Sequence, residues 1–222
     1  MNISAKKRKR AQRNPSSSPV GFKLAQVRES KGSRFCYLMS TIIFLNGTSS
    51  SGKTTLLKAL QKKLQEPYLD MGIDKFIWML PGRYLERPLW DEVLGKALQA
   101  GPLGLTLFSG MHHAIAATAQ RGNNILADHV FVEKVWVDEC ATLFAEMNAY
   151  LIGVKCPLEV VEQREADRKD RTLGQARLQY DVIHKYVKYD LEVDTSLLNT
   201  EECVDKIIER LKSPPTAFKQ LR

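Results

Sequence analysis

The chain has 222 residues, 44% of them hydrophobic and 26% charged, which is typical of one soluble globular domain and too short for two ordinary ones. Its net charge of +8 is concentrated in residues 1–40, where ten basic residues stand against one acid. The remainder is therefore close to neutral, which leaves no general electrostatic case for nucleic-acid binding. The sequence lacks an apolar run of about 20 residues, a C-x-x-C pair and zinc-type histidine spacing. It therefore predicts a cytoplasmic protein without a membrane span or a structural metal.

Residues 1–38 are basic, rich in serine and proline and without apolar periodicity, so we expect a disordered tail. The basic run at 6–10 has three open interpretations: a nuclear-import or nucleic-acid patch, a solvated tail, or a start codon assigned too far upstream. Met39 stands where a compact domain would begin. We expect that domain to span residues 39–212, followed by a loose C-terminal tail at 213–222.

An apolar, β-branched strand at 41–46 leads into a glycine-rich loop and a helix at about 53–65. The loop matches G-x-x-x-x-G-K-[ST], in which backbone N–H groups cradle phosphates. Lys53 can reach the β- and γ-phosphates, and the Thr54 hydroxyl can ligate Mg²⁺. The sequence therefore predicts a nucleoside triphosphate site. Its expected contacts are Gly47, Thr48, Ser49, Ser50, Ser51, Gly52, Lys53, Thr54 and Thr55.

Beyond residue 65, short apolar strands alternate with helices. The expected order is a short apolar stretch at 68–69, a short helix at 75–80, a loop-rich insertion at 81–104, a helix at 105–121, a strand at 124–128, a helix at 133–147, a strand at 149–155, a helix from Pro157, a helix at 173–187, a strand at 189–194, and a last helix that the Asn199–Glu202 capping box opens. This alternation predicts an α/β fold, a parallel sheet with helices on both faces.

Asp74 and Asp128 follow strand or strand-like segments, so both are expected at the edge of the sheet that carries the phosphate loop. Asp128 could be the carboxylate that holds Mg²⁺, or it could cap a helix. Asp74 could be the general base that takes a proton from an attacking hydroxyl, or it could cap the helix at 75–80.

Three arginines, Arg164, Arg168 and Arg171, recur at spacings of four and three, which places them on one helix face. Such a charged run is either a solvated surface or a lid that closes guanidinium groups over phosphates. The lid interpretation fits a phosphate-loop protein better, and it adds Arg164 to the expected nucleotide contacts.

Several motifs together resemble the chloramphenicol phosphotransferase family. They are Ile43 to Thr54, Gly72-Ile73-Asp74, Asp128-His129-Val130-Phe131, Arg164-Glu165-x-x-Arg168-x-Asp170-Arg171 and Tyr189 to Thr195. The resemblance implies a P-loop NTPase fold, adenylate-kinase-like with an arginine-containing lid. It also implies transfer of the γ-phosphate of ATP to an alcohol of a small molecule, with antibiotic inactivation as one outcome.

Residue by residue, the resemblance assigns Asp74 to the base position, Lys53 and Thr54 to the phosphate loop, and Arg168 and Arg171 to the lid. One position differs, because the enzyme that names the family looks to carry two adjacent acids where this chain has Asp128-His129.

Two alternatives stay open. One is a kinase for a nucleoside, a sugar or the 5′ end of a polynucleotide, with the basic tail as an RNA tether. The other is a non-catalytic, nucleotide-dependent switch, which would need neither Asp74 nor an arginine lid. We expect a small-molecule hydroxyl acceptor, no membrane partner and, apart from the tail, no nucleic acid.

Overall fold

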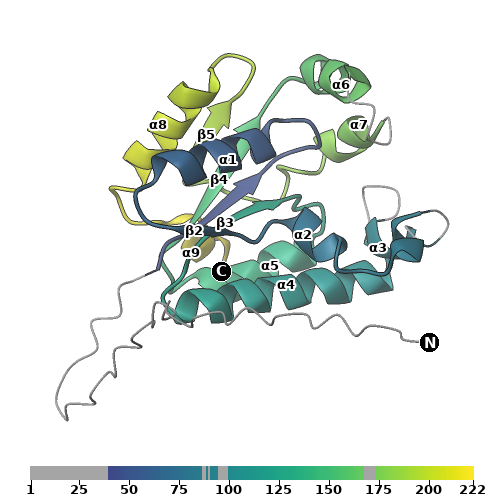
Figure 1. Cartoon of the computed structure of the whole chain (residues 1–222), viewed down its shortest axis with the longest axis horizontal. Helices are drawn as coiled ribbons and strands as arrows, with labels where there is room; N and C mark the ends of the chain where they lie inside the picture. The colour runs from purple at the N-terminus through teal and green to yellow at the C-terminus, as the bar shows by residue number, and fades with distance from the viewer. Residues whose placement is uncertain (1–39, 87–88, 90, 95–99, 168–173) are drawn as a thin grey trace, which may run out of the picture. The chain divides into compact units, whose positions relative to one another are not determined.

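A computed structural model describes residues 40–86, 89, 91–94, 100–167 and 174–222 (Figure 1). The chain divides into residues 1–36 and 37–222. The expectation of a disordered tail at 1–38 lies outside the described residues. The same holds for the lid arginines Arg168 and Arg171.

Five parallel strands form one sheet in the described part of the chain, in the order β2-β3-β1-β4-β5. They are β1 Ile42–Asn46, β2 Tyr68–Asp70, β3 Asn124–His129, β4 Ala149–Lys155 and β5 Leu191–Asp194. The three central strands are buried along almost their whole length, as expected for a parallel sheet covered on both faces. The α/β fold that the sequence predicts is confirmed.

The helices cover both faces of this sheet. Described in chain order, they are α1 Lys53–Lys63, α2 Ile73–Ile77, the 3₁₀ turn η1 Gly82–Leu85, α3 Asp91–Leu94, α4 Pro102–Gln120, α5 Lys134–Phe144, α6 Leu158–Asp167, α7 Gln175–Tyr180, α8 Thr200–Arg210 and α9 Ala217–Leu221. Figure 1 shows α1 and α8 on one face and α4 and α5 on the other. The predicted capping box at Asn199–Glu202 is present at the start of α8.

The two-residue period of β1 divides the core between these faces. Ile43 and Leu45 pack with the apolar side of α1, whereas Ile42 and Phe44 pack with α4 and α5. All four side chains are fully buried. This burial fixes the register of the strand that delivers the phosphate loop, since a slip of one residue would exchange the two faces.

Several helix boundaries differ from the sequence prediction; the helix expected at 75–80, for example, is α2 at Ile73–Ile77. α4 begins at Pro102 rather than at 105, because proline is well suited to the first helical turn and Gly101 supplies the extended N-cap. The helix expected over 173–187 ends at Tyr180, and residues 181–186 form turns. The insertion at 81–104 contains η1 and α3 in its described part.

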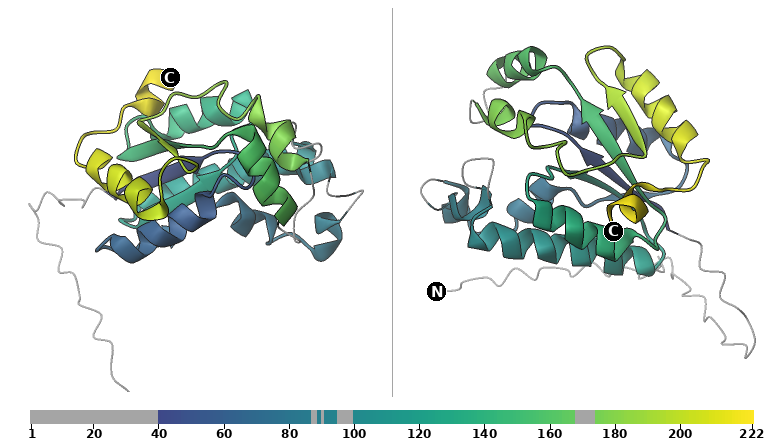
Figure 2. Two further views of the ribbon diagram at one scale, coloured as in Figure 1. Left: turned by 90° about the horizontal axis from the view of Figure 1, so that it is seen from above. Right: turned by 180° about the vertical axis from the view of Figure 1, so that it is seen from behind.

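The C-terminal residues 213–222 are not loose, which corrects the sequence prediction. They include α9, which lies against α5 and β4 (Figure 2). Phe218 is 2% exposed and its ring packs against Phe44 and Phe144, with centroids 5.5 and 5.6 Å apart. Burying such a side chain contributes about 1.5–3 kcal/mol to folding.

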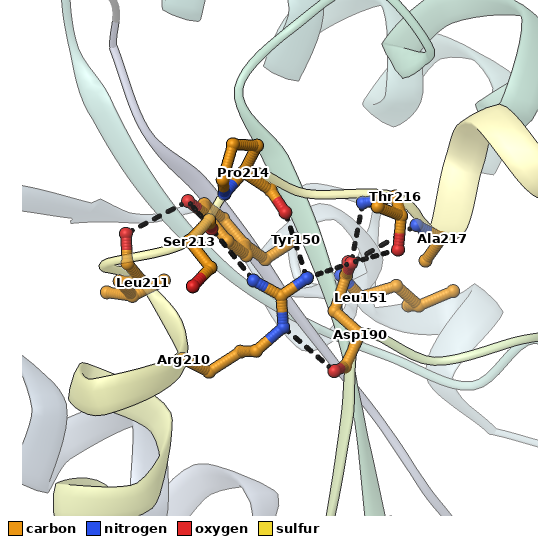
Figure 3. A network of polar contacts seen from close by, with 9 residues as sticks. All are labelled: Tyr150, Leu151, Asp190, Arg210, Leu211, Ser213, Pro214, Thr216 and Ala217. Carbon is orange, nitrogen blue, oxygen red and sulfur yellow. Dashed lines mark hydrogen bonds and ion pairs between the residues drawn. The ribbon is translucent and has the colours of Figure 1, made fainter.

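A buried ion pair holds the segment that leads to α9 (Figure 3). The Asp190 carboxylate accepts hydrogen bonds from Arg210 Nη2 at 2.8 Å and from the Thr216 N–H at 2.7 Å. Arg210 also donates to the carbonyls of Ser213 and Pro214 at 2.8 and 3.0 Å. These bonds satisfy backbone groups that a loose tail would leave to water, so the C-terminus is part of the folded domain.

Hydrogen bonds among three polar side chains join the end of β1, next to the phosphate loop, to the segment before β5. Asn46 donates to the Tyr189 hydroxyl at 2.7 Å, and that hydroxyl lies 2.5 Å from His184 Nδ1. Because Tyr189 accepts from Asn46, it can donate to His184 only if Nδ1 carries no proton. Burial, with Lys155 and Lys53 nearby, lowers the pKa of His184 to about 4.

This arrangement predicts acid sensitivity. The pKa of His184 is lower in the folded chain than the ordinary 6.5, so its stabilising contribution is complete above pH 6.5 and is lost as the pH falls towards 4. After allowance for solvent screening of a half-buried group, we expect a loss on the order of 1–2 kcal/mol. Denaturant unfolding at pH 7 and pH 4.5 measures it. His184→Gln should show a shallower pH dependence, and parallel curves for the two proteins would contradict the assignment.

Candidate active site

The phosphate loop connects the end of β1 to the start of α1, as the motif requires. Gly52, the N-cap of α1, has a φ of 95°, a backbone conformation that favours glycine. Ser50 has a φ of 61°, which is uncommon for a residue with a side chain and marks local strain. The helix therefore begins directly at Lys53, and the positive end of its dipole lies at the loop.

Lys53 closes the loop on itself. Its Nζ donates to the carbonyls of Gly47 at 2.7 Å and Thr48 at 2.6 Å, and the residue is 8% exposed. The ammonium group is thereby held over the loop, where phosphate oxygens would exchange with the carbonyls as its partners.

The residues predicted to bind nucleotide fall into two groups. Those lining the main cleft are Ser49, Ser50, Gly52, Lys53, Thr54 and Thr55. Gly47 and Thr48 instead supply the carbonyls that hold Lys53, and Ser51 supplies a carbonyl to Thr195 at 2.9 Å. The second group thus shapes the loop, while the first faces the cleft.

Thr54 and Asp128 meet at the edge of the sheet. Leu45 pairs with Asp128 in the β1–β3 register, and the Thr54 hydroxyl donates to Asp128 Oδ2 at 3.2 Å. Asp128 belongs to β3 and the N-cap of α5 is Glu133, so the helix-cap interpretation of Asp128 is wrong. A hydroxyl and a carboxylate in contact are the hard oxygen donors that Mg²⁺ prefers.

The electrostatics of Asp128 also suit a cation. Burial raises the pKa of the Asp128 carboxyl above its ordinary value, Lys53 opposes that rise, and Asp74 adds to it. A divalent cation at this place would offset the cost of burying the charge.

Asp74 lies in the first turn of α2 and lines the same cleft. The N-cap of α2 is Gly72, with an extended backbone, so Asp74 is not the helix cap. The carboxylate lies close enough to Asp128 to affect its pKa. Two acids from separate elements therefore meet beside the phosphate loop, as their positions after the strands predict.

Gly72 sets how closely α2 approaches Asp128. A Cβ at Gly72 would lie 1.8 Å from Asp128 Oδ1. Only glycine lets the Gly72-Ile73-Asp74 segment pack directly on that carboxylate.

We expect Gly72→Ala to displace the Asp128 carboxylate and to weaken Mg²⁺-dependent activity by about 10–100-fold. A titration of phosphate transfer with Mg²⁺ measures the effect. Gly82→Ala is the control, because nothing lies within 4 Å of a Cβ there. An unchanged Mg²⁺ dependence in Gly72→Ala would mean that Asp128 does not serve the metal.

The main cleft has a volume of about 1160 Å³ and extends to both sides of the phosphate loop. On one side it is lined by residues of α8 and of the segment between β5 and α8, most of them polar or small. They include Thr195, Leu198, Asn199, Thr200 and Cys203. On the side of α2 and α3, the lining is mainly apolar: Ile73, Ile77, Trp78, Leu85, Leu94 and Val130. The cleft therefore has room for a nucleotide and for a second molecule.

Arg164 is attached to the loop through Thr195. Its Nη1 donates to Thr195 Oγ1 at 3.0 Å, and its Nη2 donates to the Thr195 carbonyl at 2.9 Å. Both residues line the cleft. Thr195 was not among the predicted site residues, although its place directly after β5, at the carboxyl edge of the sheet, was a usable signal.

Glu165 is 2% exposed and accepts the N–H groups of Gly174 at 2.7 Å and Ala176 at 2.9 Å. It thus satisfies backbone donors at the start of α7. Glu165 is therefore a buried structural residue and not part of a solvated surface.

His129 faces away from the cleft. It is fully buried on the α4–α5 side of β3, where its Nε2 lies 2.9 Å from His112 Nε2. His112 in turn bonds Glu139 at 2.5 Å. Burial lowers the pKa of both histidines, which favours neutral imidazoles, although the Glu139 carboxylate opposes the shift at His112. At the Asp128-His129 pair, only Asp128 lines the cleft.

Within the residues that the structure describes, no group of three or more His, Cys, Asp or Glu side chains could hold a metal ion on its own. The same described part contains no helix long and apolar enough to cross a membrane. A metal at Thr54 and Asp128 would therefore need further ligands from phosphate and water.

The chain also matches a known protein family. A family profile described as chloramphenicol phosphotransferase-like protein matches residues 40–212. A Mycobacterium tuberculosis protein named "Putative O-phosphotransferase" is 30% identical over 196 residues, covering 82% of this chain and 87% of the relative.

Solved structures of kinases share the fold at low sequence identity. A sugar kinase from Janibacter sp. has a TM-score of 0.58 at 14% identity and covers 78% of this chain and 95% of its own. An APS kinase from M. tuberculosis, solved with AMPPNP and APS, has a TM-score of 0.55 at 15% identity, covering 79% and 99%.

Proposed function

The chain belongs to the chloramphenicol phosphotransferase-like family and is a phosphotransferase with a hydroxyl acceptor. From this premise we propose that it moves the γ-phosphate of ATP, with Mg²⁺, to a hydroxyl of an uncharged small molecule with an apolar body, and that chloramphenicol is one candidate acceptor. The observation that carries the proposal is the meeting of Lys53, Thr54, Asp128 and Asp74 in one cleft beside an apolar compartment.

Each residue has a distinct role in the proposed reaction. Lys53 binds the β- and γ-phosphates, and Thr54 and Asp128 hold Mg²⁺, which when bound neutralises charge on the phosphates. Asp74 accepts the proton of the acceptor hydroxyl as its oxygen bonds to the γ-phosphorus and the bond from that phosphorus to the β-phosphate oxygen breaks. Arg164 supports the loop through Thr195, and we propose that Arg168 and Arg171 neutralise the transferred phosphoryl group.

The apolar compartment supports an uncharged acceptor. Among the described residues lining the α2–α3 side there is no lysine or arginine, and an anionic acceptor would need such a partner. The Trp78 side chain is 68% exposed at this wall and offers a flat apolar surface. These features favour an aromatic or aliphatic alcohol over a sugar phosphate or a polynucleotide end.

The test is phosphate transfer by the full chain with Mg·ATP, followed by mass spectrometry. The acceptor panel holds chloramphenicol, other uncharged aromatic alcohols, nucleosides, sugars and anionic alcohols. We expect a product mass increased by one phosphoryl group for an uncharged, largely apolar alcohol. Transfer only to anionic or polynucleotide acceptors would contradict the proposed acceptor class. ATP binding without transfer to any acceptor would favour a nucleotide-dependent switch.

A further inference from the structure

α7 presents two glutamines, Gln175 and Gln179, to the cleft from successive turns of the same helix. Gln175 is half-buried, whereas Gln179 is 1% exposed. The Gln179 Oε1 accepts the backbone N–H of Ser49 at 2.7 Å. A side chain far away in the sequence therefore contacts one of the loop amides directly.

The other end of the Gln179 side chain has no partner. Its Nε2 is buried and makes no hydrogen bond within the described part of the chain. The hydroxyl oxygens of Ser49 and Ser50, which line the cleft, also have no hydrogen-bond partner among the described residues. Burying a polar group without a partner is costly, so three such groups around one loop require an explanation.

A ligand rich in oxygen atoms would explain them. Hydroxyl groups and a carboxamide NH₂ can all donate to phosphate oxygens, and donors to charged acceptors form the stronger hydrogen bonds. Because Oε1 is fixed by Ser49, the planar carboxamide also fixes Nε2 beside the loop.

We propose that Gln179 is a phosphate-binding residue contributed by α7, and that its Nε2 donates to an oxygen of the nucleotide's phosphate chain while its Oε1 keeps the Ser49 N–H. Gln179 thereby couples α7 to the occupancy of the phosphate loop. The inference rests on the proposed use of ATP at this loop, but it concerns nucleotide affinity and not the acceptor.

Gln179→Glu separates this role from a purely structural one. The glutamate can still accept the Ser49 N–H, but it has no donor for phosphate and adds a negative charge. We expect the dissociation constant for Mg·ATP, measured by calorimetry, to rise about tenfold or more, with a parallel rise in KM for ATP and an unchanged KM for the acceptor. Gln179→Met, which is neutral and of similar length, should also weaken ATP binding, about three- to tenfold.

Gln175→Glu is the matched control, because it places the same charge on the same helix at the cleft. Its effect should be clearly smaller. Wild-type ATP affinity in Gln179→Glu or Gln179→Met, or equal losses in Gln179→Glu and Gln175→Glu, would overturn the proposal. Thermal unfolding without nucleotide checks that each variant folds, and if the Met variant does not fold, the Glu variant carries the test.

The same measurements separate this inference from the proposed function. If the wild-type chain binds ATP but transfers phosphate to no acceptor, the proposed function fails while the binding comparison stays valid. If transfer occurs but the variants bind ATP normally, only the role of Gln179 fails.

Discussion

Replacing Asp74 with asparagine is expected to lower kcat by about 10²–10⁴-fold while leaving ATP affinity nearly unchanged. The amide keeps the size of the side chain in the first turn of α2, but it cannot accept the proton of the acceptor hydroxyl. Because Asp74 adds to the rise in the pKa of Asp128, its removal should also favour the ionised form of Asp128 and so retain the metal. Steady-state kinetics and calorimetry with Mg·ATP provide the two readouts.

Asp70→Asn is the control for this prediction. Asp70 ends β2, also raises the pKa of Asp128, and is not among the residues that line the cleft. Its carboxylate accepts the Gly72 N–H at 3.2 Å and lies 3.4 Å from the Lys75 ammonium. If both substitutions lower kcat equally, the effect comes from charge near Asp128, and Asp74 is not the base.

Lys53→Met should reduce kcat/KM on the order of 10²–10³-fold, because the ammonium group is a preorganised charge at the place where the phosphates would lie. In contrast to Asp74→Asn, this substitution is expected to weaken ATP binding as well as turnover. Calorimetry with Mg·ATP and steady-state kinetics separate the two effects.

Lys58→Met removes the same charge from an exposed position on α1 and should leave both quantities close to wild type. The carbonyls of Gly47 and Thr48 lose their donor in Lys53→Met. Thermal unfolding therefore checks that the loop change does not unfold the domain. Normal ATP affinity in a folded Lys53→Met protein would contradict the proposed role of Lys53 in binding the phosphates.

The phosphate loop and its flanking elements were predictable because their signals are local. The spacing from Gly47 to Thr54, the apolar strand before it and the amphipathic helix after it all lie within a short stretch of chain. The positions of Asp74 and Asp128 were also predictable, since parallel strands end at one edge of a sheet and their following residues meet there. The capping box of α8 was readable for the same local reason.

Other features depended on contacts between distant segments. The sequence predicts a loose tail at residues 213–222. In the structure, however, Phe218 packs against Phe44 and Phe144, and the Asp190–Arg210 ion pair anchors the segment that leads to α9. Gln179 gives no motif signal, and its importance appears only from its bond to Ser49. His129 follows the proposed metal carboxylate directly, yet the alternation of β3 places it on the opposite face of the sheet.

The sequence by itself determined the fold class and the position of the phosphate loop, because these depend on local spacing and on the alternation of strands and helices. Its resemblance to a known family indicated the reaction type. Tertiary structure alone decided that the C-terminus is part of the core, that α7 contacts the loop, and that an apolar compartment lies beside Asp74. The physical reason is that burial and hydrogen-bond satisfaction are properties of residues brought together from distant positions, and no short stretch of sequence records which of its side chains will find partners.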